Sequence, residues 1–376
     1  MKIAFAMWGA GRTGGNIVIF NVADRLAGFG HEVVIVSLGP RGNEWFKFRN
    51  KVKVYYPEEK RFKSIRIRKK LFTFAEALNI ATKKVNLMID RHKTLTDALN
   101  VYGEGADILI ATYFETAFSV YKALPDTNEK FYYIQHFESV FFNNFYDQKR
   151  VHETYFLPLK WIVNSSWALS KLTDLTKKSG ALVNPGVDTK VFYPRNVKKE
   201  GKQKVIVSLG KRDKVKGIVF LFEALDRLAK KFPNIKLKLY GFEPSLKEES
   251  PVETEYIYGP SNDQLAELYS MADVVVTPSL YESSPLPPLE AMACGVPVIT
   301  TQYGTEDFCV NDENSLVVQP CDPDAISNAM FRIFTEPSLA RKLSENGIKK
   351  SLELSWELTA SKVDMTLRSV NTVNQD

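Results

Sequence analysis

The chain has 376 residues, of which 44% are apolar and 25% are charged, proportions typical of a globular protein of about two domains. No apolar run is long enough to cross a bilayer, and residues 1–6 lack the apolar core and cleavage site of a secretory signal. The three cysteines are too few and too irregularly spaced for a disulfide framework or a zinc site, so we expect a cytoplasmic protein.

The first half of the chain predicts alternating strands and helices. Short runs rich in β-branched residues alternate with stretches of helical apolar spacing, a pattern typical of a parallel, doubly wound sheet. The strands are expected at 3–7, 33–37, 108–111, 131–135 and 161–164, and the helices at 14–26 and 74–99.

The pattern breaks around 184–188, where we place the boundary between a domain of residues 1–186 and a second domain of residues 187–355. The second domain repeats the alternation, with Ser355 as a candidate N-cap of a final helix. Its strands are expected at 205–209, 235–240, 273–277, 296–301 and 316–318, and its helices at 218–231, 262–271 and 325–334, with one more starting at 287.

Residues Gly9–Gly14 satisfy G-x-G-x-x-G after the first strand, a pattern of dinucleotide-binding folds. Such a fold also needs an acid at the end of the second strand, where Leu38-Gly39-Pro40 stands instead, while Glu32 precedes that strand. The sequence therefore favours a glycine loop that lets backbone approach a substrate over an NAD(P) oxidoreductase.

Two glutamates, Glu282 and Glu290, flank the end of a predicted strand and the start of a helix. We expect Glu282 in the loop beyond the strand and Glu290 in the helix's first turn, where an open α/β sheet binds its ligand. Loop amides and the helix N-terminus can hold a diphosphate, and Glu290 can accept hydrogen bonds from ribose hydroxyls. The amides are those of Ser284, Pro285 and Leu286.

Four cations lie within six residues after another predicted strand: Lys211, Arg212, Lys214 and Lys216. They indicate either a site for a phosphate-rich ligand or a solvated turn.

Further polar residues are candidates, of which Asp107 and Glu115 are the weaker ones. His136 lies just beyond a strand and is either structural or a ligand contact, and Asp107 and Glu115 flank a neighbouring strand. Asp322 and Asp324 imitate a D-x-D metal site, but we expect Asp324 to cap the following helix and predict no metal.

The run 277–301, TPSLYESSPLPPLEAMACGVPVITT, resembles the E-x7-E signature of retaining glycosyltransferases of family 4. Gly14-Gly15 with His31-Glu32-Val33 resembles the opening of that family, and Lys216-Gly217 resembles the end of its G-R-x4-K-G segment. The chain departs from the pattern where Lys211 takes the place of the arginine and Arg212 follows it. It also lacks both glycines of the family's D-G-x-N-G loop, at residues 313 and 315.

The resemblance implies a GT-B fold, two Rossmann-like doubly wound domains facing across a cleft, with a final helix at about 356–376 packing back on the first. It implies a retaining hexosyltransferase without cofactor or metal. The C-terminal domain would bind a nucleotide diphosphate sugar, and the N-terminal domain the acceptor. Lys216, with Lys211 or Arg212, would hold the diphosphate, Glu282 and His136 the sugar, and Glu290 the ribose. Gly14, Gly15 and Gly259 would approach the donor through their backbone.

Residues 51–100 carry thirteen Lys/Arg against five Asp/Glu, a local net of +8 within a chain of net +6. In the segment 60–72 the basic residues alternate with Phe, Ile and Leu, which indicates either an anionic membrane surface or a solvated basic loop. No nucleic-acid motif accompanies the segment, and we expect no such partner.

The runs 132–139 and 163–170 resemble glycosyltransferases that build surface polysaccharides, which implies a glycan or lipid-linked acceptor. The alternative class is a non-catalytic glycan- or lipid-binding protein on the same fold.

Overall fold

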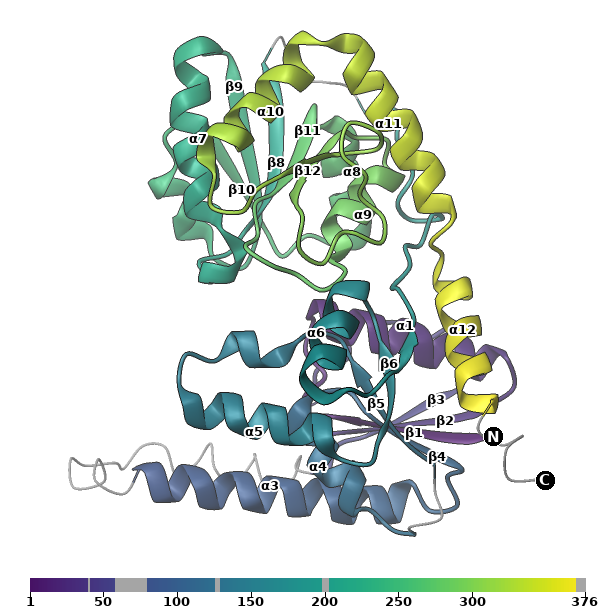
Figure 1. The fold of residues 1–376 in the computed structure, drawn as a ribbon. Coiled ribbons are helices and arrows are strands. Elements are labelled where there is room, and N and C mark those ends of the chain that lie inside the picture. Colours follow the sequence, from purple (N-terminus) through teal and green to yellow (C-terminus); the bar gives the residue numbers. More distant parts are fainter. Residues whose placement is uncertain (40, 58–79, 126–128, 198–202, 370–376) are drawn as a thin grey trace. The chain divides into compact units, whose positions relative to one another are not determined.

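The computed structural model describes residues 1–39, 41–57, 80–125, 129–197 and 203–369 (Figure 1). The basic segment 60–72 and the start of the helix expected at 74–99 lie outside these residues. The chain forms two compact units. The first comprises Met1–Asn164, Ala168–Val183 and Thr359–Asp376, and the second Ser165–Trp167 and Asn184–Leu358. In the structure the main chain passes from one unit to the other at 183/184, against the 186/187 placed from sequence.

A seven-stranded parallel sheet forms the centre of the first unit, in the order β3-β2-β1-β4-β5-β6-β7. Its middle strands are buried on both faces, as their unbroken apolar sequences require. The strands are β1 (Lys2–Met7), β2 (Glu32–Ser37), β3 (Val52–Tyr55), β4 (Ile108–Ala111), β5 (Glu129–Ile134), β6 (Lys160–Val163) and β7 (Ala181–Leu182).

Helices cover both faces of this sheet. Figure 1 shows α3 (Ile80–Tyr102), α4 (Phe114–Lys122) and α5 (Phe145–Phe156) on one face, and α1 (Gly14–Gly28) and α12 (Trp356–Arg368) on the other. The last described turns of the chain thus pack on the first unit, where His31 Nε2 lies 2.8 Å from Asp364 Oδ1. The short helix η2 (Glu138–Phe141) follows β5, and α6 (Ser166–Thr176) follows β6.

A six-stranded parallel sheet in the order β10-β9-β8-β11-β12-β13 forms the second unit. One face carries a core with α7 and α10, and the other a core with α8 and α9, on which α11 packs (Figure 1). The strands are β8 (Lys204–Gly210), β9 (Ile235–Gly241), β10 (Thr254–Tyr258), β11 (Val274–Thr277), β12 (Val298–Thr301) and β13 (Leu316–Val318). The helices are α7 (Ile218–Lys231), α8 (Asn262–Met271), α9 (Leu286–Ala293), α10 (Pro323–Thr335) and α11 (Pro337–Leu352), with the short η3 (Lys214–Lys216) and η4 (Pro244–Glu249).

The two parallel, Rossmann-like sheets confirm the predicted fold class, but two local predictions are wrong. Helix α9 begins at Leu286, so Glu290 is its fifth residue and lies beyond the first turn. Asp322, not Asp324, caps α10: its carboxylate accepts from Ala325 N, while Asp324 pairs with Arg227 at 2.7 Å. The cap moves because Pro323 opens the helix two residues earlier than expected.

Candidate functional site

Glu282 lies in the loop between β11 and α9, at the carboxyl edge of the second sheet. Its backbone N–H donates to Tyr303 O at 3.1 Å, which ties this loop to the one that follows β12. Leu280 N donates to Val215 O at 2.8 Å, which ties it to the loop that follows β8. Three loops at one sheet edge therefore fix the backbone around Glu282.

The Glu282 carboxylate forms an ion pair with Lys216, at 2.5 Å between Oε1 and Nζ. Both side chains are largely buried, with 13% of Glu282 and 23% of Lys216 exposed. The hydroxyl of Ser279 donates to the same Oε1 at 2.8 Å. No sequence motif singles out Ser279, because its contact depends on the turn that brings its side chain back to Glu282.

Two glycines allow these loops to approach so closely. Gly217 adopts φ +64°, and a Cβ there would lie 2.1 Å from Pro278 O. Gly304 adopts φ +82°, and a Cβ there would lie 2.0 Å from Glu282 O. A side chain at either position would collide with backbone. Lys216 and Glu282 can therefore meet because Gly217, next in sequence to Lys216, and Gly304, packed against the Glu282 backbone, carry no side chain.

The predicted diphosphate amides are largely absent from the start of α9. Ser284, at φ +57°, donates its N–H to Gly304 O at 2.8 Å, and Pro285 has no N–H. Among these three described residues, only Leu286 keeps a helix-terminal amide. Pro287 and Pro288 remove two more donors, so the first turn contributes far less to anion binding than a proline-free turn would.

Glu290 lies farther along α9, beside a pair of tyrosines. Its Oε2 lies 3.4 Å from the hydroxyl of Tyr269, which in turn lies 2.7 Å from that of Tyr240. Burial raises the pKa of Tyr269 well above its usual value, so its hydroxyl stays protonated and can donate. The half-buried Glu290 carboxylate therefore contacts the buried core of the second unit through Tyr269.

The structure separates the two cations that the sequence left as alternatives. Arg212 forms an ion pair with Glu249 and donates to Ser245 Oγ at 2.9 Å, both on η4. Lys211 makes a looser contact with Asp213, at 3.4 Å, and its side chain is 47% exposed. An anion that binds Lys211 therefore disrupts a weaker contact than one that binds Arg212.

Gly259 follows β10 with φ +53°, and its N–H donates to Gly241 O at 2.8 Å. Next to it, the rings of Phe242 and Tyr258 meet edge to face at 5.5 Å, with side chains that are largely exposed. Exposed aromatic faces at this edge can stack on a planar ring such as a nucleobase. No sequence motif pointed to this aromatic pair.

The other predicted site residues belong to the first unit. A Cβ on Gly15 would meet Gln135 Oε1 at 3.2 Å, so the first turn of α1 approaches the end of β5, where His136 follows. The His136 ring packs on Phe141 at 4.5 Å. Gly14 opens α1 directly after the N-cap Thr13.

The weaker candidates are structural. Asp107 accepts from Lys2 N at 2.7 Å at the amino end of β4. Glu115 is buried and pairs with His92 at 2.7 Å and with Arg150 at 2.9 Å. Glu32, the acid considered for a dinucleotide site, begins β2 and pairs with Lys53 at 2.9 Å, at the amino end of that strand.

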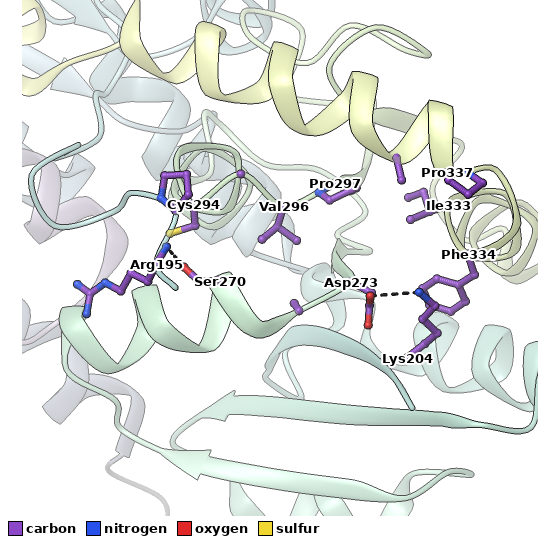
Figure 2. A pocket seen from close by; sticks show the side chains of 14 residues that line it. Arg195, Lys204, Ser270, Asp273, Cys294, Val296, Pro297, Ile333, Phe334 and Pro337 are labelled. Carbon is purple, nitrogen blue, oxygen red and sulfur yellow. Dashed lines mark hydrogen bonds and ion pairs between the residues drawn. The ribbon is translucent and has the colours of Figure 1, made fainter. Parts of the chain in front are cut away.

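A cavity of about 410 Å³ lies elsewhere in the second unit (Figure 2). It borders Lys204, Asp273 and Pro297, which stand at or just before the starts of β8, β11 and β12. Ligands of open parallel sheets bind beyond the carboxyl ends of the strands, so this cavity is at the wrong edge for the donor. Within the described ranges, no three potential metal ligands cluster. No helix there is both long and apolar enough to span a bilayer.

Comparison with known proteins shows what this chain is similar to. Residues 190–350, which lie in the second unit, match the family model described as Glycosyl transferases group 1. The MMP alpha-(1->4)-mannosyltransferase of Mycolicibacterium hassiacum is 31% identical over 57% of this chain and 54% of its own length. The alignments span about half the length of the curated relatives that match first.

Solved structures share the fold over nearly the whole chain. Sucrose-phosphate synthase from Thermosynechococcus elongatus has a TM-score of 0.78 at 20% identity, covering 99% of this chain and all of its own. An Anabaena protein solved in complex with UDP-glucose has a TM-score of 0.72 at 14% identity, covering 98% of this chain and all of its own. At these identities the likeness shows the fold alone.

Proposed function

We propose that this protein is a retaining glycosyltransferase that moves a hexose from a nucleotide diphosphate sugar to a glycan or lipid-linked acceptor. The observation that carries the proposal is the meeting of Lys216 and Glu282 at the carboxyl edge of the second sheet, 2.5 Å apart, within residues that match a glycosyltransferase family. A cation for a diphosphate and an acid for sugar hydroxyls then lie side by side.

In this proposal the second unit binds the donor. Lys216 and Lys211 neutralise the diphosphate, because Arg212 is already paired with Glu249. Glu282 accepts hydrogen bonds from the sugar, and Glu290, backed by Tyr269, from the ribose. The base lies near Gly259, against the exposed faces of Phe242 and Tyr258. The first unit takes the acceptor, with His136 assigned to the sugar and the backbone of Gly14 and Gly15 to the donor.

The chemistry follows from where charge develops. Cleavage of the anomeric bond leaves positive charge on the sugar ring and negative charge on the departing diphosphate. Lysines aimed at the diphosphate stabilise that negative charge, and the single helix amide at Leu286 adds little. Glu282 is not assigned as a covalent nucleophile. The acceptor attacks from the face that the diphosphate leaves, and the diphosphate assists its deprotonation.

The test is donor binding and turnover by Lys216→Ala and Glu290→Ala, after a thermal-shift screen of nucleoside diphosphates and their sugars. We expect each change to weaken donor binding about tenfold or more and Lys216→Ala to lower turnover roughly a hundredfold. Lys230→Ala is the matched control, since that exposed lysine pairs along α7 with Asp226. Site assignment fails if neither variant differs from the control. Donor binding without hydrolysis or transfer to any acceptor would support a non-catalytic protein.

We propose that the reaction belongs to surface polysaccharide or glycolipid synthesis. In this proposal the protein lies in the cytoplasm and binds the inner face of the cell membrane peripherally through the segment 60–72. Basic residues interleaved with apolar ones support this because both classes favour an anionic bilayer surface. Flotation with phosphatidylserine vesicles should be lost when the cations of 60–72 are neutralised, and unchanged flotation would contradict the membrane role.

A further inference from the structure

The Lys216–Glu282 ion pair occupies the groups that a donor needs. The same Glu282 oxygen takes the Lys216 ammonium at 2.5 Å and the Ser279 hydroxyl at 2.8 Å. A diphosphate must recruit that ammonium, and a sugar hydroxyl must reach that carboxylate. With both groups mostly buried, the pair is weakly screened by solvent and competes with the donor for each partner.

Ser279 is anchored independently of Lys216. It is 2% exposed, and its carbonyl accepts the hydroxyl of Thr301 at 2.5 Å, in the neighbouring strand β12. Its own hydroxyl therefore keeps its position when the lysine moves. Lys216, in contrast, is the last residue of η3 and reaches Glu282 through a long, rotatable side chain.

We propose that the Lys216–Glu282 pair is the resting state of the donor site, which the donor diphosphate exchanges, and that Ser279 is the positioning residue that holds Glu282 once Lys216 has left. The diphosphate draws the ammonium away, and the released carboxylate, still held by Ser279, turns its remaining acceptor capacity to the sugar hydroxyls. Glu282 thus opposes binding of a bare nucleoside diphosphate while favouring the sugar-bearing donor. This inference rests on the proposed function.

The first test is the affinity for the nucleoside diphosphate, chosen among UDP, GDP and ADP by the thermal-shift screen. Glu282→Gln keeps the shape and removes the charge that competes for Lys216. Calorimetry should show that the Glu282→Gln variant binds the diphosphate roughly three- to tenfold tighter than the unchanged protein does. Turnover, in which the diphosphate is released from the nucleotide sugar, should be slower in the variant. Glu253→Gln is the matched control, because it breaks a Lys–Glu pair of 3.2 Å with Lys236 in the same unit.

The second test separates positioning by Ser279 from a merely structural role. Ser279→Ala should leave the diphosphate affinity within about twofold of the unchanged protein and lower kcat about tenfold, since only the sugar-bearing state needs a held Glu282. A structural defect would change both quantities together. Ser351→Ala, which removes another buried serine hydroxyl of this unit, should change neither.

The outcomes distinguish this inference from the proposed function. If Lys216→Ala weakens diphosphate binding but Glu282→Gln binds no tighter than the unchanged protein, the two groups do not compete and the exchange is overturned. If Ser279→Ala lowers affinity and kcat alike, its positioning role is overturned. If no nucleoside diphosphate binds, or Lys216→Ala binds it as well as the unchanged protein, the donor site itself is misassigned.

Discussion

At the scale of single residues, the first unit buries a carboxyl group that none of the proposed steps uses. Glu138 is 2% exposed and accepts from Phe114 N at 2.8 Å and from the Tyr132 hydroxyl at 2.9 Å. Burial raises the pKa of Glu138 to about 8, although both hydrogen bonds oppose that shift. The folded protein therefore keeps a proton here that the unfolded chain, with a pKa near 4.5, releases in neutral solution.

We predict that Glu138→Gln removes a pH-dependent loss of stability. A raised folded-state pKa contributes stability that is fully present below pH about 4.5 and is lost as pH rises to about 8, at up to ~1.4 kcal/mol per pH unit. Urea unfolding should show the variant close to the unchanged protein at low pH and more stable than it at alkaline pH. Exposed Glu153→Gln is the control. A stability difference that does not vary with pH would contradict the prediction.

At the scale of elements, the loops of the proposed donor site depend on glycines, and the free-energy cost of substituting a glycine depends on what its new Cβ would meet. Gly304→Ala places a Cβ against the Glu282 carbonyl and also strains φ, whereas Gly105→Ala strains φ with no atom within 4 Å. Calorimetric unfolding should show a cost of about 1–2 kcal/mol for Gly105→Ala and a larger one for Gly304→Ala. Only Gly304→Ala should also weaken donor binding. Equal costs would show that the loop yields without moving Glu282.

Elements and motifs differed in how far the sequence could predict them. The unbroken apolar run 108–111 and the helical apolar spacing of 218–231 are local patterns, and the bounds of both elements came out as expected. Lys216 and Glu282 stand in linear motifs, so the sequence identified both as candidates. The pairing of Arg212 with Glu249 and the use of the Ser284 amide by Gly304 are tertiary contacts over 20 to 37 residues. No local pattern predicts such contacts.

Some elements were not predicted, because their apolar faces are short or mixed with polar residues. They are helices α4, α5, α6 and α11 and strands β3, β7 and β10.

At the scale of the whole molecule, the chain leaves the first unit after Val183 and returns to it at Thr359. The passage is crowded: a Cβ on Gly186 would lie 2.2 Å from Ser355 C, and Val187 bridges to Ser355 as a parallel pair. The segment that follows Val183 and the segment that precedes Thr359 therefore lie side by side. This close approach explains why the alternation of strands and helices is interrupted at Asn184-Pro185-Gly186. The first unit is complete only when the last helix has been added.

Because α12 completes the first unit, we expect changes in α12 to destabilise that unit. Leu367 is fully buried on α12, whereas Met365 on the same helix is 68% exposed. Leu367→Ala should cost about 2–5 kcal/mol of unfolding free energy, through lost burial and the cavity left behind, while Met365→Ala should cost little. Native-state hydrogen exchange should show the loss in the first unit, around β2, because α12 belongs to that unit and its Asp364 pairs with His31, just before β2. Faster exchange confined to β8 and β11 would mean that the last helix stabilises the second unit instead.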